Sequence, residues 1–227
     1  EKLECAIISL KKIFKKVFFY NNKVIVEAGV MLGNLVKQLN SKNISGYESL
    51  IGVPGTVGGA LIMNAGAFGS EISNNFISAK TVNKKGLIKE YNKSHITFSY
   101  RKSSFPKDEI LVEATFKCIK GDKEKISYKK IKSSNERKEK QPLKYRSAGS
   151  IFKNPKEYAA GYLIDKSNLK GFQIGEAQIS EKHANFIINK GNAKAKDVMD
   201  LIKIIKEKVY TNFKIKLELE IKLIGIK

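Results

Sequence analysis

The sequence predicts an α+β fold, and three observations support this. Segments with strand-like alternation of apolar residues are interspersed with segments in which apolar residues recur about every three to four positions, as in a helix. A glycine-rich stretch at residues 51–71 lies among them and carries hardly a charge before Glu71. The chain has 227 residues, 42% of them hydrophobic, which is enough to bury a core in one or two domains.

The first half of the chain contains three clear elements. Residues 23–28 are typical of a short strand. A helix follows, with apolar residues at helical spacing and a stop before Asn43 and Gly46; these are Leu32, Leu35, Val36 and Leu39. Residues 111–118 alternate and predict a half-buried strand. Its inward face is predicted to consist of Val112, Ala114, Phe116 and Cys118.

The second half contains two helices and a strand. Residues 123–140 predict a solvated helix or helix pair with a thin apolar stripe at Ile126 and Ile131, ended by Gln141-Pro142. Residues 198–209 form an amphipathic pattern, with Asp197 favourably placed in the first helical turn. Residues 216–224 alternate as a last strand, which on its own pattern is a surface strand with its charges in water.

The glycine-rich stretch, IGVPGTVGGALIMNAGAFGSE, predicts a loop that cradles a ligand. Glycine is favoured where φ is positive or where a backbone must approach something closely, and exposed N–H groups suit a phosphate or a flavin edge. The alternative is a tight loop between two strands. The spacing fits neither a Walker A loop nor the compact dinucleotide fingerprint.

The formal net charge of +21 raises the possibility of a nucleic-acid-binding protein. However, 40 of the 43 basic residues are lysines spread along the whole chain, which favours compositional drift over a binding stripe. A positive field still helps to recruit small anionic ligands. In such a chain arginine is informative, because it is a planar bidentate donor; Arg101 is the most notable of the three.

Several other classes of protein are disfavoured. No apolar run approaches the ~18 residues of a membrane span, and the first residues lack a secretory apolar block, so we expect a cytoplasmic protein. Cys5 and Cys118 have no C-x-x-C partner and are interpreted as buried small residues. Ser150 lies among small residues without a G-x-S-x-G elbow, which is typical of a helix cap or a turn and disfavours a serine hydrolase.

Five motifs in order nevertheless resemble one family across nearly the whole chain from residue 23. They are VPGTVGGALIMNAGAFGSE, FSYRKSSFP, KQPLKYRSAGSIFKNP, AGYLIDKSNLKGFQIGEAQISEKHANFIINKGNA and LELEIKLIG. Together they closely resemble the UDP-N-acetylenolpyruvoylglucosamine reductases, also called UDP-N-acetylmuramate dehydrogenases. The spacing from Arg101 to Ser150 resembles the shorter class without an extra tyrosine loop.

The resemblance implies an FAD enzyme of peptidoglycan precursor synthesis that uses NADPH to reduce an enolpyruvyl ether to a lactyl ether. It assigns Ser150 as the proton donor to C2, while Arg101 and Glu220 stabilise the enolate-like intermediate, the glutamic acid as a protonated hydrogen-bond donor. The residues it places in the flavin-contacting loop are Gly55, Thr56, Gly58, Gly59, Asn64 and Gly66. Those it places near the substrate are Lys140, Asn154 and His183, and a packed structural role for His183 stays open.

The resemblance also implies a domain arrangement. We expect a partial FAD-binding α/β domain at residues 1–140, a small α/β substrate-binding domain at 141–215, and a strand at 216–227 that returns to the flavin site. The expected partner is a small nucleotide-sugar substrate, with no metal, no membrane and no specific nucleic acid. We expect a monomer.

Two departures from the family pattern stand out. The chain begins at Glu1, and the family's Gly-Ser-Asn turn for the FAD pyrophosphate has no counterpart before Lys23, so the sequence is predicted to be truncated. A scaffold that has lost FAD binding and activity is therefore an alternative, beside the nucleic-acid-binding protein. Glu176 replaces a glycine that family members usually carry.

Overall fold

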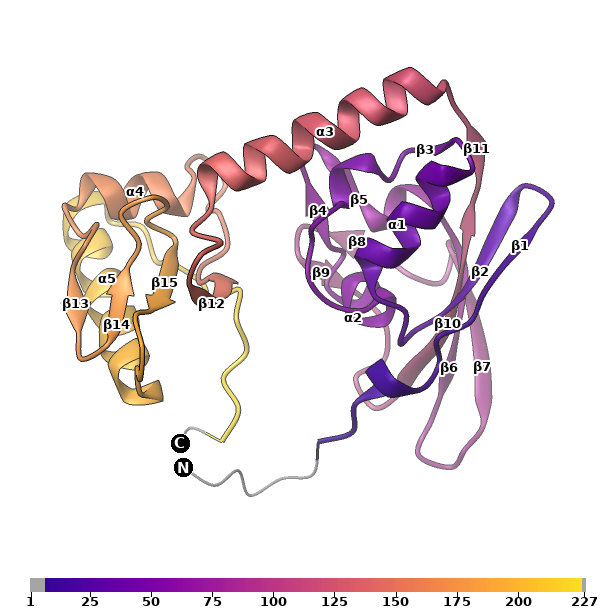
Figure 1. The fold of residues 1–227 in the computed structure, drawn as a ribbon. Helices are drawn as coiled ribbons and strands as arrows, with labels where there is room; N and C mark the ends of the chain where they lie inside the picture. The colour runs from indigo at the N-terminus through magenta and orange to yellow at the C-terminus, as the bar shows by residue number, and fades with distance from the viewer. Residues whose placement is uncertain (1–6, 226–227) are drawn as a thin grey trace. The chain divides into compact units, whose positions relative to one another are not determined.

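A computed structural model describes residues 7–225 of the chain (Figure 1). These residues divide into two compact units, the first ending at Arg137 and the second beginning at Lys138. Each contains helices and sheet and has its own apolar core. The predicted α+β class is confirmed.

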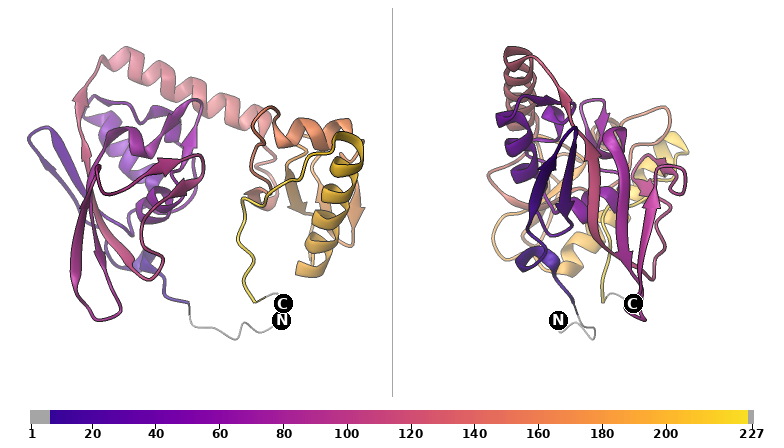
Figure 2. Two further views of the ribbon diagram at one scale, coloured as in Figure 1. Left: turned by 180° about the vertical axis from the view of Figure 1, so that it is seen from behind. Right: turned by 90° about the vertical axis from the view of Figure 1, so that its right-hand side faces the viewer.

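The first unit is built on a five-stranded antiparallel sheet with the order β1-β2-β10-β6-β7. Its strands are β1 (Val17–Tyr20), β2 (Lys23–Glu27), β6 (Phe76–Val82), β7 (Ile88–Asn92) and β10 (Ile110–Lys117). Helices α1 (Leu32–Ser41) and α2 (Val57–Ile62) lie on one face of this sheet (Figures 1 and 2). The strand predicted at 23–28 and the helix predicted at 32–39 are thus confirmed, the helix with its four apolar residues buried.

Short elements complete this unit. Three two-residue pairings connect β3 (Ile44–Ser45) with β11 (Ile119–Lys120), β4 (Gly66–Ala67) with β5 (Ser70–Glu71), and β8 (Phe98–Ser99) with β9 (Lys102–Ser103). Single turns of 3-10 helix occur at η1 (Leu10–Lys12), η2 (Glu48–Leu50) and η3 (Ile72–Asn75).

Strand β10 departs from the predicted alternation at its start. A register shift between Leu111 and Glu113 leaves Val112 as an extra residue opposite β6. A bulge of this kind changes which residues face inward. Leu111 is therefore buried and Val112 only half-buried, so the inward face assigned to Val112 is wrong, whereas Ala114 and Phe116 are buried as predicted. Cys118 is half-buried rather than buried; Cys5 lies outside the described residues.

Helix α3 (Lys123–Lys140) is one continuous helix that ends before Gln141-Pro142, as predicted for residues 123–140. Ile126 is buried, with 4% exposure, and its side chain lies close to Gly121. Ile131 is 52% exposed, so the predicted apolar stripe is wrong at this position. Ser133, two turns after Ile126, is the other buried residue of the helix.

The second unit contains a four-stranded antiparallel sheet with the order β12-β15-β14-β13. Its strands are β12 (Arg146–Ser150), β13 (Gln173–Ile174), β14 (Ala177–Ile179) and β15 (Phe186–Asn189). Helix α4 (Ala160–Lys166) lies between β12 and β13 in the sequence. Helix α5 (Ala195–Phe213) follows β15 and lies against one face of the sheet (Figure 2). The helix predicted at 198–209 is confirmed, and Asp197 accepts a 2.9 Å hydrogen bond from the Lys194 N–H in its first turn.

The predicted last strand at residues 216–224 is wrong. The segment is extended but makes a single bridge, between Leu219 and Phe152, before the chain bends at Glu220. The partner segment is short, since it runs into Pro155, which has no N–H to donate. Leu217 is accordingly buried, whereas Leu223 is 41% exposed.

Candidate functional site

The glycine-rich stretch folds into α2 and the loops around it. Thr56 caps the helix, its Oγ1 accepting a weak 3.4 Å hydrogen bond from the Gly59 N–H. The N–H groups of Val57 and Gly58 donate to the carbonyl oxygens of Val30 and Ala28, at 2.8 and 3.0 Å. These two donors are used inside the fold, so the expectation of freely exposed N–H groups is wrong for them.

The glycines of this stretch serve different needs. Gly55 has a φ of +111° and Gly69 a φ of +80°, backbone conformations that side chains disfavour. Gly58 lies so close to β2 that a Cβ would be 2.9 Å from the Ala28 Cβ, and a Cβ on Gly66 would be 2.7 Å from the Ser70 carbonyl oxygen. Gly59 is different, because its nearest neighbour would be Thr56 Oγ1 at 3.6 Å.

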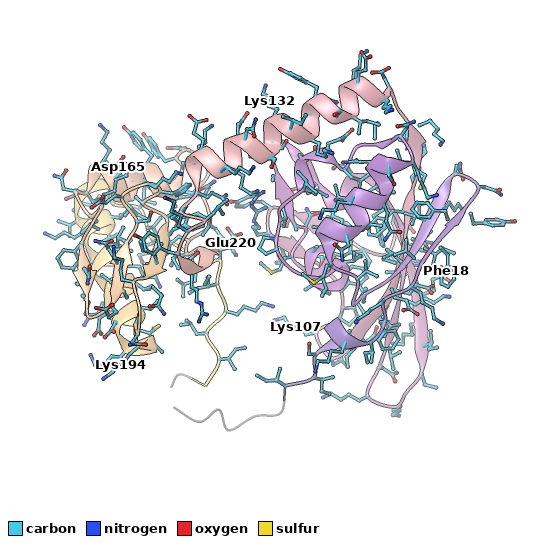
Figure 3. The ribbon with its side chains drawn as sticks, in the orientation of Figure 1. Phe18, Lys107, Lys132, Asp165, Lys194 and Glu220 are labelled. Atoms are coloured by element: carbon cyan, nitrogen blue, oxygen red, sulfur yellow. The ribbon has the colours of Figure 1, made fainter. Side chains whose placement is uncertain are left out.

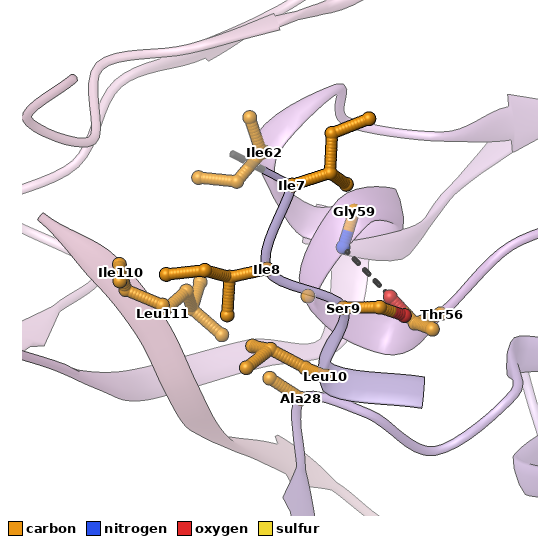
Figure 4. Close-up of a pocket in the computed structure, with 11 residues that line it drawn as sticks. Ile7, Ile8, Ser9, Leu10, Ala28, Thr56, Gly59, Ile62, Ile110 and Leu111 are labelled. Atoms are coloured by element: carbon orange, nitrogen blue, oxygen red, sulfur yellow. Dashed lines mark hydrogen bonds between the residues drawn. The ribbon is translucent and has the colours of Figure 1, made fainter. Parts of the chain in front are cut away.

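A pocket of about 390 Å³ adjoins α2 (Figure 4). Thr56, Gly58 and Gly59 form part of its lining, and Ile7, Ile8 and Leu10 line it from the start of the described chain. The remaining residues are Ser9, Ala28, Ile62, Ile110 and Leu111. Its volume and its mostly apolar walls are within the range of small-molecule sites.

Asn64 is fully buried and has a φ of +43°. Its Nδ2 donates to Glu71 Oε2 at 2.7 Å and to the Ser99 carbonyl oxygen at 3.1 Å. Its Oδ1 is buried without a hydrogen-bond donor among the described residues. Asn64 therefore connects the end of the glycine-rich stretch to β8.

Arg101 lies in the turn between β8 and β9 with a φ of +55°. This left-handed conformation is uncommon for a long side chain. The hairpin is attached to α2 by the Asn64 bond at Ser99 and by a 2.7 Å hydrogen bond from Ser103 Oγ to the Ile62 carbonyl. The guanidinium lies over the Tyr100 ring, 4.9 Å from its centroid.

In the second unit, Ser150 is the last residue of β12 and follows a bulge. Ser147 pairs with Ile188 and Ser150 with Phe186, so β12 has one residue more than β15 between these pairs. Gly149 has a φ of +83° at this point. Bulges next to active sites redirect side chains, which is the local reason for the small residues before Ser150. Ser150 is a strand residue, and the helix-cap interpretation is wrong.

The backbone of Glu220 is hydrogen-bonded to Ile151, the residue that follows Ser150. Its N–H donates to the Ile151 carbonyl oxygen at 2.8 Å, and the Lys153 N–H donates to Glu218 at 2.9 Å. Figure 3 labels Glu220 on the extended segment that follows α5. Glu220 and Ser150 are both half-buried. The C-terminal segment therefore bonds Glu220 to Ile151, the residue that follows Ser150 in the chain.

Asn154 and His183, the predicted substrate contacts, both lie next to the first residues of α4. Asn154 Oδ1 accepts a 3.0 Å hydrogen bond from the Ala160 N–H. The His183 ring packs on Phe186, with centroids 4.8 Å apart, and its Cε1 would be 3.2 Å from a Cβ on Gly161. Burial lowers the pKa of His183, which keeps the ring neutral at pH 7. Lys140 is the last residue of α3 and is exposed.

In the second unit Glu220 is thus bonded to the residue after Ser150, whereas Asn154 and His183 contact the first residues of α4. Arg101 and the glycine-rich stretch belong to the first unit. A site that joins Arg101 with Ser150 and Glu220 stays a prediction.

One residue with a direct bearing on the site was missed from the sequence. Asn185 is 3% exposed and its side chain bonds both backbone groups of Phe152. The available signal was an amide within the apolar run of HANFII, since a buried polar side chain is normally hydrogen-bonded.

Glu176 occupies the turn between β13 and β14, directly after Gly175, whose φ is +52°. Its Oε2 would be 2.8 Å from a Cβ on Gly191, and its carbonyl oxygen accepts a hydrogen bond from the Lys190 N–H. The carboxylate therefore lies against the turn after β15, where Gly191 leaves room for it.

No helix within residues 7–225 has the length and apolar character to cross a membrane. The same residues contain no group of three or more His, Cys, Asp or Glu side chains that could hold a metal ion.

Comparison with known proteins identifies the family. Residues 2–92 match the family model described as an FAD binding domain, and residues 141–224 match the one described as the UDP-N-acetylenolpyruvoylglucosamine reductase C-terminal domain. A UDP-N-acetylenolpyruvoylglucosamine reductase of Rickettsia prowazekii is 42% identical over 98% of this chain and 76% of its own length. This chain belongs to the UDP-N-acetylenolpyruvoylglucosamine reductase family.

Other members of the UDP-N-acetylenolpyruvoylglucosamine reductase family agree. The reductase of Clostridium kluyveri is 45% identical over 96% of this chain and 71% of its own length. The crystal structure of the reductase from Thermus caldophilus matches with a TM-score of 0.80 and 38% identity, covering 90% of this chain and 73% of that one. The resemblance seen in the sequence is confirmed.

Proposed function

We propose that this chain is an FAD-containing reductase that uses NADPH to convert the enolpyruvyl ether of UDP-N-acetylglucosamine into UDP-N-acetylmuramate, a precursor of peptidoglycan. Membership of the reductase family supports the reaction. The observation that carries it is the hydrogen bond from the Glu220 N–H to Ile151, the residue that follows Ser150, because Ser150 and Glu220 both match the family positions for handling the intermediate.

The first unit offers features that fit FAD. The pocket beside α2 contains Thr56 and Gly59, and Gly59 leaves space that a side chain would fill. We assign cofactor contacts to Gly55, Thr56, Gly58 and Gly59, whereas the burial of Asn64 and the tight packing of Gly66 favour a supporting role for these two. When bound, FAD supplies a carrier that accepts hydride from NADPH and delivers it to the substrate.

The chain's own residues manage the charge and the proton. Hydride addition at C3 of the enolpyruvyl group places a carbanion at C2, conjugated with the carboxylate. Arg101 stabilises the developing negative charge with a fork of donors, and Glu220 contributes a hydrogen bond to the intermediate. Ser150 transfers its proton to C2, which completes the lactyl ether.

The substrate is anionic, and the net charge of +21 favours its approach. In the second unit we assign substrate contacts to Lys140, Asn154 and His183. Neutral His183 accepts the Asn185 N–H at Nδ1 over 3.3 Å, so its proton is on Nε2, which is then a donor.

The proposal is tested with the full chain and added FAD. We expect the protein to acquire the visible absorption of bound flavin and to oxidise NADPH only when UDP-N-acetylglucosamine enolpyruvate is present, with a product heavier by one hydride and one proton. Protein that binds flavin but shows no substrate-dependent NADPH oxidation would contradict the assigned reaction.

A further inference from the structure

The pairing between β12 and β15 continues past the start of β15, where the side chain of Asn185 takes part in it. The last backbone pair is Ser150 with Phe186, and the Ile151 N–H then donates to the Asn185 carbonyl oxygen at 2.9 Å. At Phe152 the amide of Asn185 takes over. Its Oδ1 accepts the Phe152 N–H at 2.9 Å and its Nδ2 donates to the Phe152 carbonyl at 2.8 Å.

The reason is the course of the backbone before β15. The Phe186 N–H donates to the His183 carbonyl at 2.9 Å, which closes a turn, so residues before Asn185 leave the sheet. The neighbouring chain therefore has no backbone peptide group opposite Phe152 that could bond its N–H and its carbonyl oxygen. The Asn185 amide has the donor and the acceptor of a peptide group and replaces it.

Each polar atom of Asn185 has a hydrogen-bond partner. Besides the two amide bonds and the carbonyl bond to Ile151, its N–H donates to His183 Nδ1 at 3.3 Å. Asn185 is 3% exposed and Phe152 is fully buried. Removal of the Asn185 amide would therefore leave the N–H and the carbonyl oxygen of Phe152 buried without these hydrogen-bond partners.

These bonds hold the segment that carries the proposed chemistry. Ile151 is bound on one side by Asn185 and on the other by Glu220, whose N–H reaches the Ile151 carbonyl. Ser150 precedes Ile151 directly and follows the bulge at Gly149, whose φ is +83°. The orientation of Ser150 therefore depends on how firmly Ile151 and Phe152 are held.

We propose that Asn185 is a positioning residue, whose side-chain amide holds Ile151 and Phe152 so that the Ser150 hydroxyl and the Glu220 carboxyl keep their places for the protonation step. This inference rests on the proposed reductase function. It predicts that loss of the amide impairs proton transfer to the substrate selectively and leaves hydride transfer from NADPH to the flavin intact.

The test uses rapid-mixing kinetics of Asn185→Ala, with both half-reactions expressed per bound flavin. We expect flavin reduction by NADPH to stay within about twofold of wild type, and reoxidation by substrate to slow by roughly 10- to 100-fold, as for a small misplacement of reacting groups. Equal slowing of both half-reactions, or no slowing of either, would overturn the proposal.

Two further variants complete the design. If Asn185→Ala does not fold, Asn185→Asp is used; its protonated form has the same donor and acceptor as the amide, so reoxidation should recover as the pH is lowered, and a flat profile would overturn the proposal. Asn189→Ala is the matched control, because it removes an amide of β15 that accepts hydrogen bonds from Gly191 and Ala193 in the turn after the strand. We expect no selective slowing of reoxidation in Asn189→Ala.

A wild-type enzyme without substrate-dependent turnover would refute the reductase function itself, before any variant is compared.

Discussion

The N–H of Glu220 donates a 2.8 Å hydrogen bond to the carbonyl oxygen of Ile151. This bond joins two segments that are far apart in the sequence, and it pairs Glu220 with the residue that directly follows Ser150. It also explains how the C-terminal segment can contribute to a site without being a regular strand, because one bridge and two flanking hydrogen bonds are enough to fix its register.

Glu220→Gln should retain more turnover than Glu220→Ala. An amide can donate a hydrogen bond to the intermediate as a protonated carboxyl does, whereas alanine cannot. Steady-state kcat for the two variants checks this. Glu218→Gln is the control, because the Glu218 side chain is 77% exposed and forms a surface ion pair with Lys153 at 3.3 Å, so we expect its kcat to be close to wild type. If kcat falls equally in Glu220→Gln and Glu220→Ala, Glu220 does not act as a hydrogen-bond donor.

Arg101→Gly should separate stability from activity. Glycine adopts a φ of +55° without the cost of about 1 kcal/mol that a side chain incurs, so the unfolding midpoint should match or exceed wild type. Turnover should fall by 100-fold or more, on the order of the loss of one electrostatic donor. Arg101→Lys should also lose turnover far more than stability, since lysine lacks the planar fork.

The control for this variant is Asn21→Gly, in the turn between β1 and β2, where φ is +51°. It should show the same stability behaviour with unchanged turnover. Full activity in Arg101→Gly would show that the arginine is only a turn residue.

Gly59→Ala and Gly58→Ala should differ in kind. A Cβ at Gly59 meets nothing closer than 3.6 Å inside the fold but narrows the pocket, so this variant should fold normally and bind FAD more weakly. A Cβ at Gly58 would be 2.9 Å from the Ala28 Cβ, so that variant should lose stability by about 1–3 kcal/mol through overpacking. Urea unfolding and FAD titration measure the two effects.

Gly33→Ala in α1 is the control, because its Cβ would meet no atom within 4 Å. It should keep wild-type FAD affinity and gain slightly in stability from the better helix propensity of alanine. Unchanged FAD affinity in Gly59→Ala would move the cofactor away from this pocket.

Glu109 should make the stability of the first unit depend on pH. Its side chain is 3% exposed and accepts hydrogen bonds from Thr81 Oγ1 at 2.5 Å, from Lys89 Nζ at 2.9 Å and from the Tyr91 hydroxyl at 3.0 Å. The hydrogen bond from Thr81, followed by that from Lys89, lowers the pKa of Glu109. The stabilisation is therefore complete above the unfolded-state pKa of about 4.3 and is lost as the pH falls through the lower folded-state pKa.

Glu109→Gln should lower the free energy of unfolding at pH 7 and flatten its decline below about pH 4, which urea titrations across this range would detect. Glu90→Gln, on the exposed side of β7, is the matched control and should change neither. A Glu109→Gln profile parallel to wild type would show that this carboxylate does not contribute to acid sensitivity.

Periodicity was sufficient for elements whose pattern is local. The burial of Leu32, Leu35, Val36 and Leu39 in α1 follows from helical spacing alone. The bulge at Val112 could not be read in the same way, because it depends on the register with β6. Similarly, Gly58 is required by a contact with Ala28 on another element, which its neighbours in sequence do not reveal.

The site residues show the same division. Ser150 and Glu220 are identified only through the resemblance, because their local patterns are equally typical of a turn or helix cap and of a surface strand. The bond between Glu220 and Ile151, and the amide of Asn185 at Phe152 some 33 residues away, arise only when separate segments pack together. Arg101 stood out in a lysine-rich chain, but its left-handed backbone is a property of the turn between β8 and β9.

Reoxidation of the reduced flavin in Ser150→Ala tests the proposed chemistry most directly. The variant should be reduced by NADPH at the wild-type rate, because that step needs no proton at C2. Mixing the reduced variant with UDP-N-acetylglucosamine enolpyruvate should then leave the flavin reduced, or reoxidise it slower by at least about 100-fold. Reoxidation at the wild-type rate would show that another group delivers the proton.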